Sequence, residues 1–201
     1  MATPKAQRIG IWIIAVVMVI GTLGSFAVMI LANDNAKIDQ QEQARLQKEA
    51  YAEYEKQLAE QEKAAAGLST THYPQFEQYK SSPATFDASE VGDKVQTKDL
   101  KNGDGEVITK DTKYQAYYIG WNPKGKSFDS SFDGDKLKAP IDTSTTPGLI
   151  QGWQDGVIGM KVGGVREITI PSDLAYKETG SGDDIPPNTP LKFVIYIIAT
   201  K

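Results

Sequence analysis

An uncharged apolar run extends from Ile9 to Leu31 and restricts this chain more than any other segment does. Only Thr22 and Ser25 within its 23 residues carry polar side chains. At about 1.5 Å per residue, a helix of this length spans about 35 Å, enough to cross a hydrocarbon core of about 30 Å. The run therefore predicts a transmembrane helix. A cleaved secretory signal is the alternative, but the apolar part of such signals is only about 7–15 residues long.

Charges beside this run indicate its orientation. Lys5, Arg8 and the amino terminus precede it, whereas Asp34, Lys37 and Asp39 follow it. Positive charge is retained on the cytoplasmic side, so we expect residues 1–8 to form a short inner tail. The prediction is a retained single-pass anchor in the cell membrane, with the lipid bilayer as its partner and the remaining chain on the extracytoplasmic side.

Residues 32–66 are rich in Gln, Glu, Lys and Ala and contain neither Gly nor Pro. Opposite charges recur at helical neighbour spacing, as in Glu53 and Lys56, which favours a solvated helical spacer. Its larger apolar residues do not keep a heptad register, so coiled-coil dimerisation is possible but unsupported. Gly67 is expected to end this helix. Residues 67–89 then read as a linker or loosely docked extension, and His72 within them as a solvated surface residue.

Residues 90–201 have the texture of a globular domain, with short apolar runs separated by Gly, Pro, Asn and Asp. Runs rich in β-branched and aromatic residues predict strands at 113–120, 165–170 and 191–199, the last one central in its sheet. Ile150, Trp153, Val157 and Met160 recur at spacings of three and four, which predicts one short helix. The predicted fold class is α+β, an antiparallel sheet folded over one short helix. The stretch 101–106 (KNGDGE) is interpreted as a turn.

Composition excludes several chemistries. The chain has no Cys and one His, so thiolate catalysis and Cys-ligated metals are absent, and a histidine site would depend on His72 alone. The net charge of -4 provides no global positive field, so nucleic acid is not expected as a partner. Phosphate-binding, zinc-protease and nucleophile-elbow motifs do not occur, and no cofactor or metal is predicted. Aromatic and aliphatic residues in turns instead suit a pocket for an apolar ligand.

Seven short motifs in residues 91–201 follow one another in the order of a known family. They are 118–120 (YIG), 125–131 (GKSFDSS), 149–153 (LIQGW), 159–163 (GMKVG), 170–171 (IP), 174–176 (LAY) and 185–189 (IPPNT). In this order they resemble FKBP-type peptidyl-prolyl cis/trans isomerases. The resemblance implies a twisted antiparallel sheet wrapped around one short helix, with a shallow apolar pocket for a prolyl ring between them.

The resemblance also implies roles for individual residues. Trp153 is the expected pocket floor, the Ile150 N–H and the Tyr176 hydroxyl are the expected donors to substrate carbonyls, and Asp129 is expected to organise the polar edge. The expected walls are Tyr118, Phe128, Leu149 and Phe193, and the substrate-binding rim includes Ala175, Asp184 and Ile185. Without the motifs, Trp153 and Phe193 would be interpreted as core residues, and Asp129 as a turn cap.

Such a site fits the chemistry of proline isomerisation. Twisting an Xaa-Pro amide removes its conjugation, and this loss creates a barrier of about 18–20 kcal/mol. No proton has to be transferred during the rotation. An apolar, water-poor site that holds the flanking carbonyls favours the twisted amide. The expected partners are proline-containing peptides, unfolded clients and macrolide inhibitors of this family. A proline-binding holdase with little turnover and a structural membrane cap are the alternatives.

Two positions depart from the family pattern. Lys177 stands where the family usually has Gly, so a loop conformation with positive φ would be strained there. Asp184 replaces an apolar residue of the pocket rim. We expect Asp183 and Asp184 to favour clients that carry a basic residue beside the proline.

Overall fold

The computed structural model of the chain describes residues 40–81, 85–146 and 148–201. The chain divides into two compact units, residues 1–57 and 58–201. Within these described ranges, no helix is both long enough and apolar enough to cross a membrane. The predicted span from Ile9 to Leu31 lies outside them, as do the tail and the start of the predicted spacer.

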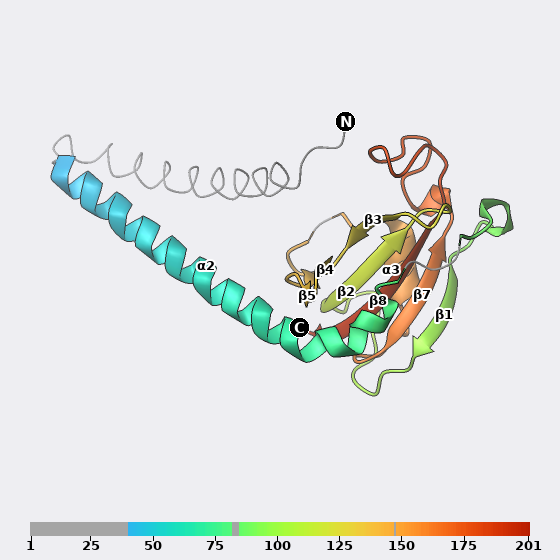
Figure 1. The fold of residues 1–201 in the computed structure, drawn as a ribbon, viewed down its shortest axis with the longest axis horizontal. Coiled ribbons are helices and arrows are strands. Elements are labelled where there is room, and N and C mark those ends of the chain that lie inside the picture. The colour runs from blue at the N-terminus through green and yellow to red at the C-terminus, as the bar shows by residue number, and fades with distance from the viewer. Residues whose placement is uncertain (1–39, 82–84, 147) are drawn as a thin grey trace. The chain divides into compact units, whose positions relative to one another are not determined.

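The second unit contains a six-stranded sheet with the order β1-β7-β8-β2-β3, in which β6 also pairs with β2 (Figure 1). Every strand pair in it is antiparallel. The strands are β1 (Gln96–Lys101), β2 (Tyr114–Trp121), β3 (Ser127–Ser130), β6 (Ile141–Asp142), β7 (Val165–Ile170) and β8 (Leu191–Thr200), and β4 (Phe132–Asp133) and β5 (Lys136–Leu137) form a separate hairpin. The predicted strands coincide with β2, β7 and β8, and the central place of β8 is confirmed.

One short helix, α3 (Gln151–Val157), packs against β7. Its glycines allow the close approach: a Cβ on Gly152 would lie 2.2 Å from the Ile170 side chain, and one on Gly156 would lie 3.0 Å from Ile168. The predicted α+β fold, an antiparallel sheet wrapped around one helix, is confirmed. Three single turns of 3-10 helix complete the described elements, namely η1 (Glu77–Tyr79), η2 (Ala88–Glu90) and η3 (Ser172–Leu174).

The sheet buries both of its faces. Alternate residues of β2 point to opposite sides, since Ala116 belongs to the core cluster around α3, whereas Tyr117 and Ile119 belong to a second cluster on the other face. β8 alternates in the same way, with Phe193 on the α3 side and Tyr196 on the other side. Two strands therefore connect the two cores directly.

The second face is covered by the end of the long helix α2 (Gln40–Phe76), contrary to the sequence expectation (Figure 1). Gly67 does not end this helix, which continues to two residues beyond Pro74. A glycine inside a helix costs about 1 kcal/mol relative to alanine, and burial of the following turns offsets that cost. Phe76 is fully buried, and a side chain of this size contributes about 1.5–3 kcal/mol.

His72 is likewise not a solvated surface residue. It is half-buried, and its Nδ1 lies 3.0 Å from the Tyr196 hydroxyl. That hydroxyl donates to Gln75 Oε1 at 3.0 Å, so the imidazole Nδ1–H is the donor to the Tyr196 oxygen. Of the two alternatives for this segment, a linker and a docked extension, residues 68–79 therefore correspond to the docked extension.

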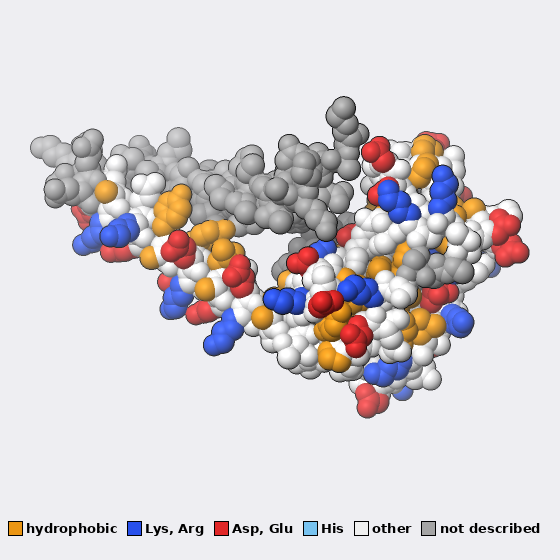
Figure 2. Space-filling view, in the orientation of Figure 1, with side chains coloured by type: hydrophobic (Ala, Val, Ile, Leu, Met, Phe, Trp, Pro, Cys, Tyr) orange, Lys and Arg blue, Asp and Glu red, His pale blue; other side chains and the backbone are white. Residues whose placement is uncertain are grey.

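The exposed surface carries mixed charge. Figure 2 shows Lys and Arg side chains interspersed with Asp and Glu side chains over the visible face. Large apolar side chains are exposed on α2 before its docked turns, namely Leu46, Tyr51 and Leu58.

Candidate functional site

Four aromatic rings meet between the sheet and the start of α3. Trp153 comes from α3, Tyr118 from β2, Phe128 from β3 and Phe193 from β8. The Trp153 ring lies edge-on to Tyr118 and to Phe193, with centroids 5.2 Å apart in both pairs. Phe128 meets Phe193 edge-on at 5.4 Å. The structure thus brings these four residues together, and their role in binding substrate stays a prediction.

Gly120 allows two of these rings to approach each other. A Cβ at this position would lie 2.6 Å from Phe193 and 2.7 Å from Phe128. Real Cβ atoms do not come that close, so any larger residue would displace both walls. The glycine in the YIG motif is explained by this packing.

Trp153 is 3% exposed, and it lies at the base of the cluster. Its indole N–H donates to the Tyr114 hydroxyl at 3.0 Å, which fixes the ring plane. Phe193 is 4% exposed, whereas Tyr118 and Phe128 are half-buried. The tryptophan is thus a core residue and the base of the ring cluster at once, and the half-buried rings form the accessible side.

A polar edge borders the rings. The Tyr118 hydroxyl donates to Asp129 Oδ2 at 2.5 Å, and the other oxygen of this carboxylate accepts from the Ser130 N–H at 2.8 Å. Burial and the negative charge of Asp129 raise the pKa of Tyr118 well above its usual range. This phenol stays protonated at physiological pH and holds the carboxylate in place. Asp129 thus accepts one hydrogen bond from a ring of the cluster and one from the backbone of its own strand.

Tyr176 belongs to the same edge. Its side chain is 36% exposed, and burial together with the Asp129 charge raises its pKa. Its hydroxyl is therefore a neutral donor near the ring cluster. Ala175 precedes it and packs against the core cluster.

The start of α3 supplies a backbone donor. Ile150 is its N-cap, and its carbonyl oxygen accepts from the Trp153 and Gln154 N–H groups. Within the described part of the chain, the Ile150 N–H itself makes no hydrogen bond. Leu149 and Ile150 are half-buried beside the aromatic cluster. Their placement suits a carbonyl acceptor brought in by a ligand.

The loop after β7 carries the two departures from the family pattern. Lys177 has φ 53°, so the expected positive φ is confirmed. Its N–H donates to the Ser172 carbonyl, and its own carbonyl accepts from Asn188, which hold it in this conformation. Ile185 is 4% exposed and lies in the core beneath the expected rim.

Asp184 is not a free carboxylate on the rim. It forms a close ion pair with Lys126 in the loop between β2 and β3. Its carbonyl oxygen accepts from the Asn122 side-chain amide at 3.0 Å, so the β2–β3 loop and the 180–187 loop are joined at two points. Any attraction of basic clients by Asp184 has to compete with Lys126.

Sequence reasoning missed two supporting residues. Tyr114 orients Trp153, and Ile141 on β6 packs against the same core as the site walls. The period of two along β2 could have placed Tyr114 on the face of Tyr118, but its hydrogen bond depends on the tertiary structure. Ile141 ends the segment 138–141 (KAPI), which has no apolar run that would mark Ile141 as a wall residue.

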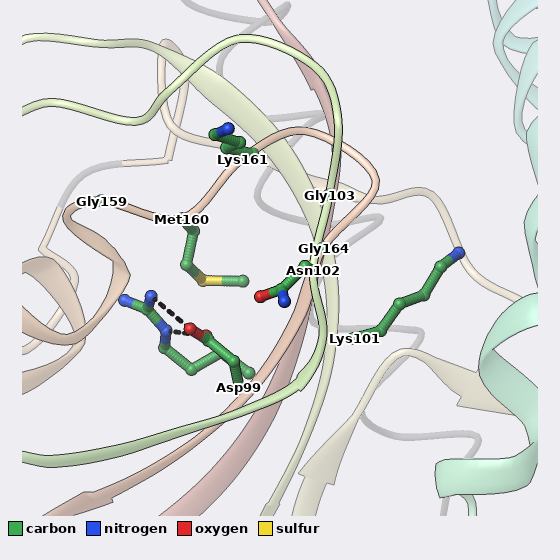
Figure 3. Close-up of a pocket in the computed structure, with 9 residues that line it drawn as sticks. Asp99, Lys101, Asn102, Gly103, Gly159, Met160, Lys161 and Gly164 are labelled. Carbon is green, nitrogen blue, oxygen red and sulfur yellow. Dashed lines mark hydrogen bonds and ion pairs between the residues drawn. The ribbon is translucent and has the colours of Figure 1, made fainter.

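Two cavities are lined by residues other than the four rings. One of about 260 Å³ lies between the end of β1 and the loop before β7, beside Asp99, Asn102 and Met160 (Figure 3). The only guanidinium there, Arg166, makes four hydrogen bonds, to both Asp99 oxygens and to the carbonyls of Gly156 and Ile158. It is therefore engaged in structural bonds. The other cavity, of about 380 Å³, lies beside Tyr114, Leu149 and Gln154.

Metal chemistry has no set of ligands in the described ranges, since no group of three His, Cys, Asp or Glu side chains could hold an ion there. The site offers rings, two phenols, one carboxylate and a backbone N–H. These groups can hold a peptide and exclude water from it. They include neither a thiol nor an imidazole that could attack the peptide as a nucleophile.

Comparison with known proteins identifies the class. The family described as FKBP-type peptidyl-prolyl cis-trans isomerase matches residues 104–198. The FK506-binding protein of Neisseria meningitidis serogroup A is 38% identical over 101 residues, which cover 50% of this chain and 90% of that protein. The probable FK506-binding protein of Corynebacterium glutamicum is 39% identical over 103 residues, covering 50% of this chain and 82% of that protein.

A crystal structure of a peptidyl-prolyl cis-trans isomerase from Pseudomonas syringae pv. tomato is also similar, with 28% identity and a TM-score of 0.46. The aligned region covers 69% of this chain and 95% of the Pseudomonas chain. Because this chain covers 90% of the Neisseria protein at 38% identity, it belongs to the FKBP-type peptidyl-prolyl cis-trans isomerase family. The predicted enzyme class is confirmed.

Proposed function

We propose that this chain is a membrane-anchored prolyl isomerase that accelerates the folding of exported proteins on the extracytoplasmic side of the cell membrane. The observation that carries the catalytic part is the cluster of Tyr118, Phe128, Trp153 and Phe193 beside the Tyr118–Asp129 hydrogen bond. The apolar run from Ile9 to Leu31 carries the anchoring part.

The reaction needs the proline ring to be held while the preceding amide twists. The half-buried rings of Tyr118 and Phe128 exclude water from the prolyl side, above the base formed by Trp153. A twisted amide has lost its charge separation, so such an environment favours it over the planar forms. The barrier falls because the bound peptide is both desolvated and positioned.

Two donors complete the proposed substrate contacts. The Ile150 N–H binds one carbonyl of the peptide, and the Tyr176 hydroxyl binds a second one. Both donors are protonated at neutral pH, because one is a backbone amide and the other is a phenol, whose pKa burial raises further above its usual value. No general acid or base is required.

The proposed ligands follow from the same surface. Proline-containing peptides and unfolded clients present the prolyl ring, and macrolides of the FK506 type would compete for the ring cluster. The relatives named FK506-binding proteins support this ligand class. Uncatalysed prolyl isomerisation takes about tens to hundreds of seconds, so it is slow enough to limit folding. An anchored isomerase would accelerate this step for chains that fold at the membrane.

A protease-coupled assay with a short Xaa-Pro peptide tests the catalytic part. We expect FK506-sensitive turnover in the full-length protein, lowered by Tyr176→Phe and Trp153→Leu, while Tyr51→Phe on the exposed helix leaves turnover unchanged. Peptide binding without turnover would instead support the holdase alternative.

Membrane extraction tests the anchoring part. We expect the protein to remain with membranes after carbonate washing and to be degraded by protease added outside the cytoplasmic membrane. Release into the soluble fraction would refute a retained anchor, and protection from external protease would refute the proposed orientation.

A further inference from the structure

The docked end of α2 holds a hairpin that adjoins the candidate site. Phe76 is fully buried, and its ring stacks on Phe132 of β4 with centroids 5.1 Å apart and planes 4° from parallel. The same ring also lies near Tyr117 and Tyr196 on the back of the sheet. One side chain of the helix therefore touches both the sheet and the hairpin.

Three hydrogen bonds attach the rest of the hairpin to the same segment, one of them from Lys80 Nζ to the exposed Asp135 carboxylate. The Leu137 N–H on β5 donates to Ser69 Oγ at 2.8 Å, and both residues are buried. Beyond the helix end, Lys80 Nζ donates to the Gly134 carbonyl in the hairpin turn at 2.7 Å. The strands of this hairpin have two residues each, and a hairpin of that size is not stable alone. Its position depends on the helix segment.

The hairpin is connected to the polar edge of the site through Ser131. The Lys138 N–H donates to the Ser131 carbonyl at 2.9 Å. Ser131 in turn exchanges two bonds with Tyr118: its N–H donates to the Tyr118 carbonyl at 2.8 Å, and its Oγ accepts from the Tyr118 N–H at 2.9 Å. The Tyr118 hydroxyl then donates to Asp129. A continuous set of contacts thus leads from Ser69 to Asp129.

We propose that residues 69–80 position the isomerase site, with Ser69, Phe76 and Lys80 as positioning residues for Tyr118 and Asp129. This rests on the proposed function of that site. The segment lies outside residues 104–198, the part of the chain that matches the FKBP-type family. Residues 69–80 hold the hairpin in place, and the hairpin holds Ser131. Ser131 in turn bonds to the backbone of Tyr118, which positions the Tyr118 ring.

The test compares two neighbouring hydroxyls in the full-length protein. Ser69→Ala removes the acceptor for Leu137, whereas Thr70→Ala removes an exposed hydroxyl that bonds only to the Ala66 carbonyl of its own helix. We expect Ser69→Ala to lower kcat/KM for a proline peptide about threefold to tenfold, and Thr70→Ala to leave it unchanged. Equal activity of the two variants would overturn the proposal. An inactive wild-type protein would instead refute the proposed function.

A second measurement separates positioning from lost stability. In folded Ser69→Ala, the amide resonances of Tyr118 and Ser131 should shift, whereas they should stay in place in Thr70→Ala. In an Asp129→Asn background, Ser69→Ala should cost little further activity, because the residue that it positions has already been altered. The same fold-loss in both backgrounds would show a merely structural role.

If Ser69→Ala does not fold, Lys80→Met decides the question, because Lys80 is exposed and its loss leaves no buried group unpaired. We expect it to lower kcat/KM about twofold and to shift the Ser131 amide resonance. Wild-type activity with unchanged resonances would overturn the proposal.

Discussion

The Trp153 indole N–H donates to the Tyr114 hydroxyl at 3.0 Å, so the base of the ring cluster is oriented by a residue on the neighbouring strand β2. Tyr114 is 5% exposed, and burial raises the pKa of its phenol, which stays protonated. The pair is therefore a neutral hydrogen bond inside the core.

Replacing Tyr114 by Phe tests this hydrogen bond. The change leaves a buried indole N–H without a partner, which costs about 1–3 kcal/mol in unfolding free energy. Because the Trp153 ring is then less firmly oriented, kcat/KM for a proline peptide should fall as well. Denaturant unfolding gives the stability, and Tyr51→Phe on the exposed helix provides the matched control. Equal unfolding midpoints for the two variants would contradict the role assigned to Tyr114.

Replacing Lys177 by Gly tests the strain in the loop after β7. Lys177 has φ 53°, and a non-glycine residue in the left-handed region costs about 1–2 kcal/mol. Glycine also gains freedom in the unfolded chain, so the expected net stabilisation is smaller, about 0.5–1 kcal/mol. Glu178→Gly is the matched control and should destabilise, because that position does not need a positive φ. Stabilisation by both changes or by neither would refute this account.

Lys177 and Tyr114 show what can and cannot be predicted from a sequence. The positive φ at Lys177 was predictable because a family glycine marks a backbone position. The strands and α3 were predictable from β-branched runs and from the three-and-four spacing of Ile150, Trp153 and Val157. The bond between Tyr114 and Trp153 was not, because a hydroxyl that meets an indole across a core leaves no local pattern.

The docking of α2 could not be predicted from the sequence either, because it also depends on contacts between distant residues. The segment 68–79 mixes Ser, Thr, Pro and aromatic residues, and its contacts with Tyr117, Phe132 and Tyr196 depend on residues far along the chain. The low helix propensity of glycine predicted that the helix ends at Gly67. In the structure, burial of Phe76 outweighs the free-energy cost of one glycine inside the helix. The ion pair between Asp184 and Lys126 likewise joins residues that are far apart in the chain, so no local pattern predicts it.

Protonation of His72 should weaken the docked end of α2. Burial lowers the pKa of His72 from its usual 6.5, so the unfolded chain binds this proton more readily than the folded chain does. Stability is then greatest above the unfolded pKa and falls as the pH drops below it. The groups around the imidazole are Tyr117, Tyr196 and Gln75, none of which carries a negative charge to stabilise the cation.

Unfolding midpoints measured between about pH 7.5 and pH 5.5 check this expectation. The wild-type protein should lose stability over this range, and His72→Gln should lose less, because glutamine has no charge to gain. The exposed charges of α2 are the same in both proteins, so the difference between the two curves isolates His72. Parallel curves would show that His72 makes no contribution to the pH dependence.

Removing the partner of Asp184 tests whether the rim selects clients by charge. In the wild-type protein, Lys126 pairs with Asp184 and reduces its attraction for a basic peptide. Lys126→Met keeps much of the side-chain length and leaves the carboxylate without this cation. At low salt we expect kcat/KM for a Lys-flanked proline peptide to rise relative to a Glu-flanked one by about twofold to fivefold, and the gain to fade with added salt. Lys124→Met changes the same net charge in the same loop, where no ion pair with Asp184 occurs among the described residues. A ratio that rises equally in both variants would indicate a general charge effect and would exclude Asp184 as the selecting group.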